Sequence, residues 1–147
     1  FDRTAQELSF CGIYMFDLNS TRLELISDVM EFPNGVGLSP DEKYLYVNSS
    51  DMTKPEIMRF DLKSGEGELF FNGPFSPEET GWFDGMDVHP SGAIFTAGPG
   101  GVVVVSEDGK HLATIPLEAP ATNVCFDKSY KTLFYTGFGF VGRILLQ

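Results

Sequence analysis

The stretch PNGVGLSPDEKYLYV at residues 33–47 decides the predicted fold, because two later segments repeat its pattern. Each copy has a polar residue at the start of a short apolar strand, then a polar turn, then a second apolar strand. The other two copies lie at residues 84–95 and 122–135. Two short apolar segments on either side of such a turn predict a β-hairpin. The sequence therefore contains three copies of one hairpin.

The spacing of the copies predicts a β-propeller. From Asn34 to Asp84 to Asn123 the starts are 50 and 39 residues apart, and a period of about 40–50 residues with several short strands is typical of propeller blades. The innermost strands of the blades line a central channel. We therefore expect Asn34, Asp84 and Asn123 to converge at one mouth of this channel, which is where chemistry is expected.

Composition supports an all-β fold and narrows the choice of partners. The 147 residues suffice for one domain. With 16 Gly and 42% hydrophobic residues, the chain is too apolar for disorder and suits a sheet protein with glycine turns. A formal charge of −11 excludes a basic stripe for nucleic acid. A cation or a neutral small molecule is the expected partner.

The sequence also indicates in which cellular compartment the protein is found. No apolar run reaches the ~18–20 residues that would cross a bilayer, so no membrane partner is expected. The two cysteines, Cys11 and Cys125, form no CxxC motif, and Cys125 alternates with apolar residues, so a buried free thiol is predicted there. These features fit a reducing compartment, and we expect a cytoplasmic protein.

Turn signals divide residues 1–147 into the blades of a single propeller-type domain. The Gly- and Pro-rich segment 72–81 is the longest predicted loop, and no window has the spacing of a stable helix. The predicted units are a partial blade at 12–28, blades at 34–72 and 84–116, and a partial blade at 122–147.

Six motifs, in order along the chain, carry a family resemblance. They are AQELSFCGIY at 5–14, PNG at 33–35, SPDEKYLYV at 39–47, DGM at 84–86, AGPGGV at 97–102 and IP at 115–116. The sequence resembles the C-terminal half of the gluconolactonase, regucalcin and senescence-marker-protein family of six-bladed β-propellers. The resemblance implies half of such a propeller, about three four-stranded blades.

The resemblance also implies a metal-dependent lactonase. By similarity, Asn34 and Asp84 would bind a divalent cation, with Ca²⁺ ahead of Zn²⁺, Mg²⁺ or Mn²⁺, and Asp84 would also help water attack a lactone or a related ester. Amide and carboxylate oxygens are ligands that Ca²⁺ prefers. The family's Glu ligand and its Arg and Asn substrate contacts belong to the half that this sequence lacks, so no residue here inherits those roles.

Other residues near the predicted mouth have two interpretations each. Trp82 and Phe83 precede Asp84 and either wall a substrate pocket or pack the long loop. Asn123 either lines the site or simply begins its strand.

His89, in a turn at the far end, and His111, on an outer strand, are expected to be structural.

Two classes of function therefore stay open at this stage. One is a gluconolactonase-like hydrolase that is active only when the propeller is completed. The other is a non-catalytic half-propeller that binds calcium, a ligand or a partner chain, and the chain is alternatively a fragment of a longer lactonase. The open ends of about three blades predict association, and we expect a homodimer that closes a six-bladed ring.

Overall fold

The computed structural model describes residues 4–73, 75–76 and 78–146, which form thirteen β-strands in four antiparallel sheets and no helix. No helix in this part of the chain is long and apolar enough to cross a membrane. The fold is therefore all-β, as the sequence predicts.

The sheets follow one another along the chain, and each is a simple meander. The first is the hairpin of β1 (Ile13–Asp17) and β2 (Arg22–Ser27). The second contains β3 (Pro33–Leu38), β4 (Tyr44–Ser49), β5 (Glu56–Asp61) and β6 (Gly67–Asn72). The third contains β7 (Met86–Val88), β8 (Ile94–Gly98), β9 (Gly101–Val105) and β10 (His111–Pro116). The last contains β11 (Ala121–Phe126), β12 (Thr132–Gly137) and β13 (Phe140–Leu145).

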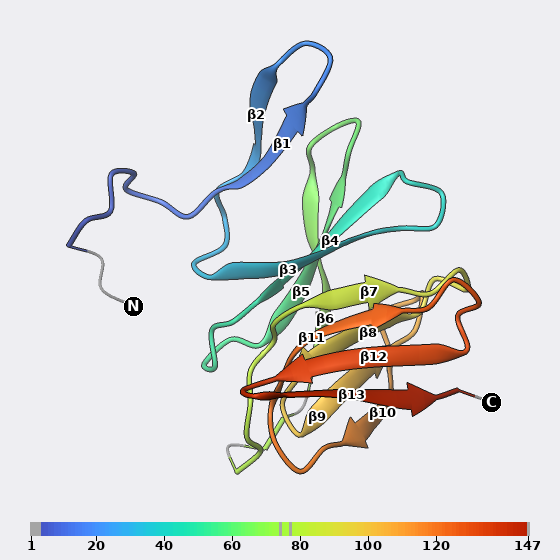
Figure 1. Cartoon of the computed structure of the whole chain (residues 1–147). Helices are drawn as coiled ribbons and strands as arrows, with labels where there is room; N and C mark the ends of the chain where they lie inside the picture. Colours follow the sequence, from blue (N-terminus) through green and yellow to red (C-terminus); the bar gives the residue numbers. More distant parts are fainter. Residues whose placement is uncertain (1–3, 74, 77, 147) are drawn as a thin grey trace.

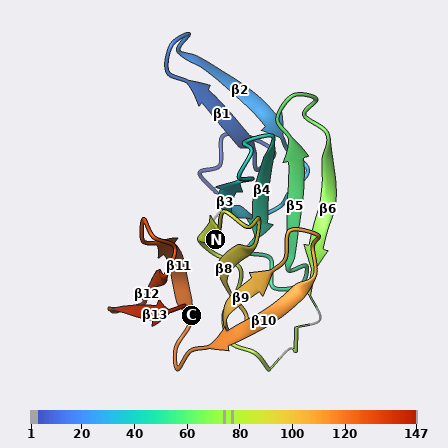
Figure 2. The ribbon, with the colours of Figure 1, turned by 90° about the vertical axis from the view of Figure 1, so that its right-hand side faces the viewer.

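The sheets are arranged as consecutive blades of a β-propeller. The first strands of the last three sheets lie side by side, β7 between β3 and β11. Each later strand of a blade lies further out, and Figure 2 shows this order from β3 to β6. The hairpin β1–β2 and the sheet β11–β13 occupy the two ends of the arc (Figure 1). The chain thus forms half of a propeller.

The hydrophobic core lies between the blades in three separate clusters. One contains Tyr46, Phe83 and Val103, between the β3–β6 and β7–β10 sheets. A second packs the hairpin residue Ile13 against Val47, and a third packs Val102 against the last sheet. Neighbouring residues of β4 and of β9 enter different clusters because strand side chains alternate between faces. Consequently β9 and the first four residues of β4 have no polar alternation.

All loops that enter the inner strands β3, β7 and β11 lie at one end of the propeller. Antiparallel pairing places Pro33 opposite Ser49 and Glu56 opposite Asn72, so the segments after β4 and after β6 lie at this same end. The long predicted loop does join an outer strand to the next inner one, between β6 and β7. Its residues 74 and 77 lie outside the described part of the chain.

The two end sheets expose apolar side chains on the faces that another blade would cover. The hairpin exposes Phe16 and Leu23, and the last sheet exposes Phe134 and Val141. The prediction of a buried Cys125 is wrong, since its side chain is exposed while Val124 and Phe126 are buried. The alternation was correct, but Cys125 lies on the face of β11 to which no described blade is adjacent.

Candidate metal and active site

The start of each inner strand contacts the start of the next. A Cβ atom on Gly35 would lie 2.1 Å from the carbonyl oxygen of Asp84, and one on Gly85 would lie 1.9 Å from Oδ1 of Asn123. Only residues without a side chain allow this approach. The two glycines therefore bring Asn34, Asp84 and Asn123 together at one end of the inner strands, which is the mouth proposed from the sequence.

Asn34 lies in a β-bulge of β3, where the pairing with β4 shifts between Pro33 and Val36. Its side chain is exposed, and its Nδ2 donates a hydrogen bond to Oγ of Ser50 at 2.8 Å. Ser50 Oγ in turn donates to the carbonyl oxygen of Phe83 at 2.7 Å. No donor among the described residues is bonded to Oδ1 of Asn34, so this oxygen is available to a ligand.

Asp84 is partly buried just before β7. Burial raises the pKa of its carboxyl group, while hydrogen bonding from the Asn34 side chain, the Gly85 backbone and the Trp82 side chain opposes this shift. Burial disfavours the charged form because the carboxylate loses water. A divalent cation at this position would stabilise that charged form.

Asn123 does not occupy the same position in its strand as Asn34 and Asp84 do in theirs. Asn34 and Asp84 lie four residues before the last paired residue of their strands, Leu38 and Val88, whereas Thr122 has this place before Phe126. Asn123 therefore corresponds to the glycines that follow Asn34 and Asp84. Its Oδ1 also accepts a hydrogen bond from the backbone N–H of Val124 at 2.9 Å.

The two aromatic residues before Asp84 have different environments. Phe83 is fully buried, with its ring 5.4 Å from that of Phe75. Trp82 is half-buried, and its ring lies 6.3 Å from that of Phe138. Phe83 thus belongs to the core. Trp82 lies between the start of β7 and the turn that follows β12.

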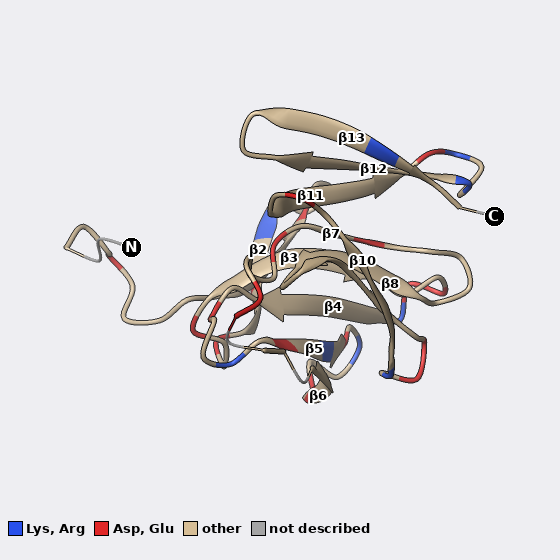
Figure 3. Cartoon of the chain, turned by 90° about the horizontal axis from the view of Figure 1, so that it is seen from below, with Lys and Arg blue, Asp and Glu red and all other residues tan. Residues whose placement is uncertain are grey.

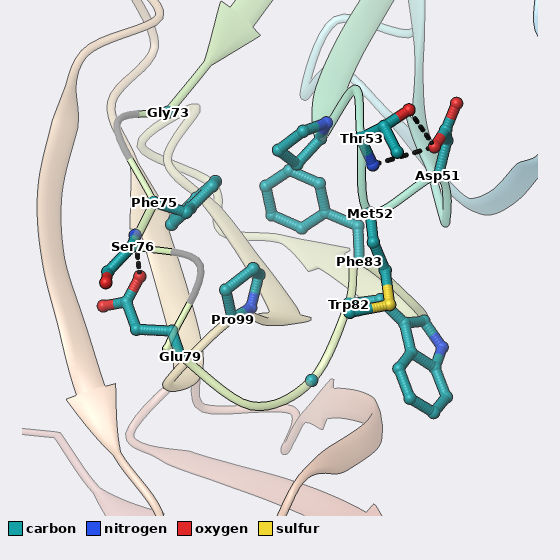
Figure 4. A pocket seen from close by; sticks show the side chains of 12 residues that line it. Asp51, Met52, Thr53, Gly73, Phe75, Ser76, Glu79, Trp82, Phe83 and Pro99 are labelled. Carbon is teal, nitrogen blue, oxygen red and sulfur yellow. Dashed lines mark hydrogen bonds between the residues drawn. The ribbon is translucent and has the colours of Figure 1, made fainter.

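A cavity of about 280 Å³ adjoins this segment (Figure 4). Three local hydrogen bonds shape its polar rim: the Thr53 backbone and hydroxyl donate to Asp51 at 2.8 and 2.7 Å, and the Ser76 backbone donates to Glu79 at 2.8 Å. The sequence did not single out residues 51–53, although they follow a strand that ends at the mouth. The lining residues are Asp51, Met52, Thr53, Pro55, Gly73, Phe75, Ser76, Glu79, Gly81, Trp82, Phe83 and Pro99.

The two histidines lie away from this site. His89 follows β7 at the opposite end, where its Nδ1 accepts a hydrogen bond from the Ser91 backbone at 3.1 Å. His111 is exposed on β10, and its ring stacks on that of Phe71 at 6.4 Å. Neither residue reaches Asp84 in the described arrangement.

The described residues offer few groups that could bind a metal ion. They contain no group of three or more His, Cys, Asp or Glu side chains placed to hold an ion. Oδ1 of Asn34 and the Asp84 carboxylate are hard oxygen donors, which suits Ca²⁺, but Ca²⁺ takes about 6–8 oxygen ligands. Acidic side chains outnumber basic ones over the molecule and lie largely in loops (Figure 3), which favours accumulation of cations.

Fold and site together define a class of protein: a β-propeller with oxygen-bearing side chains gathered at one mouth of its channel. Residues 2–138 match the family described as the SMP-30/Gluconolactonase/LRE-like region. The chain belongs to this family, and the resemblance stated from the sequence motifs is confirmed.

Curated relatives of greater length include a gluconolactonase and a lactonohydrolase. The chain is 32% identical to a gluconolactonase of Zymomonas mobilis over 95% of its own residues and 41% of that protein. It is 26% identical to a lactonohydrolase of Aspergillus oryzae, of which it spans 34%. The chain thus spans less than half of the curated relatives that it matches.

Solved structures of longer chains also superpose on this one. A gluconolactonase from Xanthomonas campestris superposes with a TM-score of 0.84 at 30% identity, over 96% of this chain and 46% of that one. A calcium-binding protein, regucalcin, from Agrobacterium tumefaciens superposes with a TM-score of 0.70 at 22% identity, over 87% of this chain and 44% of that one. The second likeness supports the fold alone.

Proposed function

We propose that the protein carrying this chain is a metal-dependent lactone hydrolase of the gluconolactonase type. The observation that carries the proposal is the contact between the Asn34-Gly35 and Asp84-Gly85 segments at the mouth of a family propeller. The similarity to gluconolactonases supplies the substrate class, a lactone or a related cyclic ester.

In this proposal Asn34 and Asp84 hold a divalent cation, Ca²⁺ ahead of Zn²⁺, Mg²⁺ or Mn²⁺. When bound, such a cation polarises the lactone carbonyl as a Lewis acid. In this proposal the Asp84 carboxylate accepts a proton from the attacking water. The water oxygen adds to the carbonyl carbon, the ring C–O bond breaks, and the proton passes to the released alcohol oxygen to give a hydroxy acid.

The activity requires a completed ring, because two protein ligands fall short of what the cation needs. The missing blades would come from a longer chain or, as proposed from the sequence, from a second copy in a homodimer. A two-fold dimer would place two Asn34 and two Asp84 side chains around one channel. The lengths of the relatives favour the longer chain.

A non-catalytic cation-binding protein is the second candidate function. It is favoured by the contact between the Asn34 and Asp84 segments, which offers oxygen ligands to a cation without requiring a substrate site. Both candidates use the same Asn34 and Asp84 positions, so turnover of a lactone distinguishes them.

The test is hydrolysis of gluconolactone in a pH-stat, with spontaneous hydrolysis subtracted, with and without EDTA. We expect EDTA to remove the activity, Ca²⁺ to restore it, and Asp84→Asn to reduce it by about 10²–10⁴-fold. His89→Ala is the control and should retain activity. If His89→Ala lost as much activity as Asp84→Asn, the proposed mechanism would be wrong.

A further inference from the structure

Ser50 sits directly behind the proposed cation ligand Asn34. It follows β4, and its backbone N–H donates to the carbonyl oxygen of Phe32 at 2.9 Å, which fixes its place beside the start of β3. The Ser50 hydroxyl donates its single proton to the carbonyl oxygen of Phe83. Its oxygen can therefore only accept a hydrogen bond from Asn34.

This constraint determines the orientation of the Asn34 amide. Oxygen and nitrogen of an asparagine side chain are distinguished by their hydrogen-bond partners. Since Ser50 Oγ must accept, the Asn34 atom 2.8 Å away is Nδ2. The amide is thus held with its donor group on Ser50, and Oδ1 is the atom left for a cation.

Asn48 fixes the distance between the two proposed ligand segments. It is fully buried, its Oδ1 accepts from the backbone N–H of Gly35 at 2.8 Å, and its Nδ2 donates to the Asp84 carbonyl oxygen at 2.5 Å. A second bond from Nδ2 to Thr96 Oγ1 at 2.9 Å completes its partners. Because of the bulge in β3, the backbone N–H of Gly35 does not pair with the backbone of β4. The Asn48 side chain accepts its hydrogen bond instead.

We infer that Ser50 and Asn48 are positioning residues for cation binding: Ser50 orients the Asn34 amide, and Asn48 locks the Asn34 and Asp84 segments of adjacent blades together. The inference rests on the proposed function, since it concerns the same metal site. Ser50 is the informative residue of the two, because Asn48 is buried in the core and its removal endangers the fold.

The experiment measures Ca²⁺ affinity by isothermal titration in the full-length protein that carries this chain. We expect Ser50→Ala to weaken Ca²⁺ binding by about 10–100-fold, the range for residues that orient metal ligands, while Ser50→Thr, which keeps the hydroxyl, restores most of it. Ser129→Ala is the matched control, because its hydroxyl makes one local bond to Asp127 at the opposite end. It should leave the affinity unchanged.

A double-mutant cycle separates positioning from general destabilisation. In an Asn34→Ala background, Ser50→Ala should cause no further loss of affinity, because the residue through which it acts is gone. Equal losses in both backgrounds would overturn the inference. In the metal-free protein, NMR should show slow exchange of the Asn34 side-chain amide protons, and Ser50→Ala should speed it.

The outcomes also separate this inference from the proposed function. If Ca²⁺ binding depends on Ser50 but no lactone is hydrolysed, the positioning role stands and the catalytic proposal fails. If the unaltered protein binds Ca²⁺ and Ser50→Ala binds it equally well, the positioning role fails and the catalytic proposal stands. If the unaltered protein binds no cation, both are overturned.

Discussion

Just before β7, the Asp84 carboxyl group is partly withdrawn from water, and this burial raises its pKa. Because the folded state holds the proton more tightly than the unfolded state, Asp84 favours folding at low pH. This contribution is lost as the pH rises through the folded pKa. The charged form present at neutral pH is therefore a cost to the metal-free protein, and a bound cation would offset it.

We expect Asp84→Asn to stabilise the metal-free protein at pH 7, with a rise of about 1–3 °C in the unfolding midpoint, and to have little effect near pH 3. In saturating Ca²⁺ the order should reverse, because a ligand stabilises only the state that binds it. Thermal unfolding in EDTA and in Ca²⁺, at several pH values, measures both effects. Equal midpoints of the two proteins under every condition would contradict the assignment of Asp84.

The turns that follow β3, β7 and β11 each contain one residue with a positive φ angle. Glu42, Gly92 and Tyr130 have positive φ angles of 56°, 85° and 57°, and side chains rarely adopt this conformation without strain. Only one of the three copies has glycine at this position.

Substitutions of Glu42 and Gly92 should therefore change the free energy of unfolding in opposite directions. We expect Glu42→Gly to raise the free energy of unfolding by about 0.5–1 kcal/mol and Gly92→Ala to lower it by about 1 kcal/mol or more, since a Cβ at Gly92 would also lie 2.8 Å from that of Glu107. Urea unfolding measures both changes. A destabilised Glu42→Gly variant would mean that the Glu42 side chain makes a compensating contribution.

At the scale of elements, the close contact between inner strands depends on Gly35. We expect Gly35→Ala to destabilise the protein by about 2–4 kcal/mol, since the added Cβ would lie 2.1 Å from backbone of the adjacent blade. It should also weaken Ca²⁺ binding by separating Asn34 from Asp84. Gly65→Ala is the control, because Gly65 has nothing within 4 Å of the added atom and should show only the strain of its positive φ.

The strands and blades could be predicted from the sequence because their signals are local. Short apolar runs between Gly, Pro and Asp turns determine β4 or β9 within a few residues. The bulge in β11 has no such signal, so the sequence pattern places Asn123 in the position of Asn34, whereas in the structure Thr122 has that position. The roles of Asn48 and Ser50 arise from contacts between blades over 33–36 residues of sequence, and no local pattern predicts such contacts.

At the scale of the whole molecule, the arc is incomplete at both ends. The hairpin β1–β2 has two strands and the last sheet has three, whereas each complete sheet has four. Both end sheets expose apolar side chains, including Phe16 at 53% and Val141 at 75% of their area. Exposed sheet edges and apolar faces favour association, so the 147-residue chain by itself should not remain a monomer in solution.

The source of the covering blades is tested by the mass in solution. Joining β13 of one copy to β1 of another would give a sheet of five strands, one more than a complete blade, so closure by a second copy requires one edge strand to move aside. If closure occurs in this way, light scattering of the isolated chain should give twice 16.2 kDa. Val141→Glu, on the open face of β13, should then break the dimer. Leu112→Glu is the control, because Leu112 is similarly exposed at 60% but lies on the outer strand of a complete blade. A folded, soluble species of 16.2 kDa at micromolar concentration would contradict association through the end sheets.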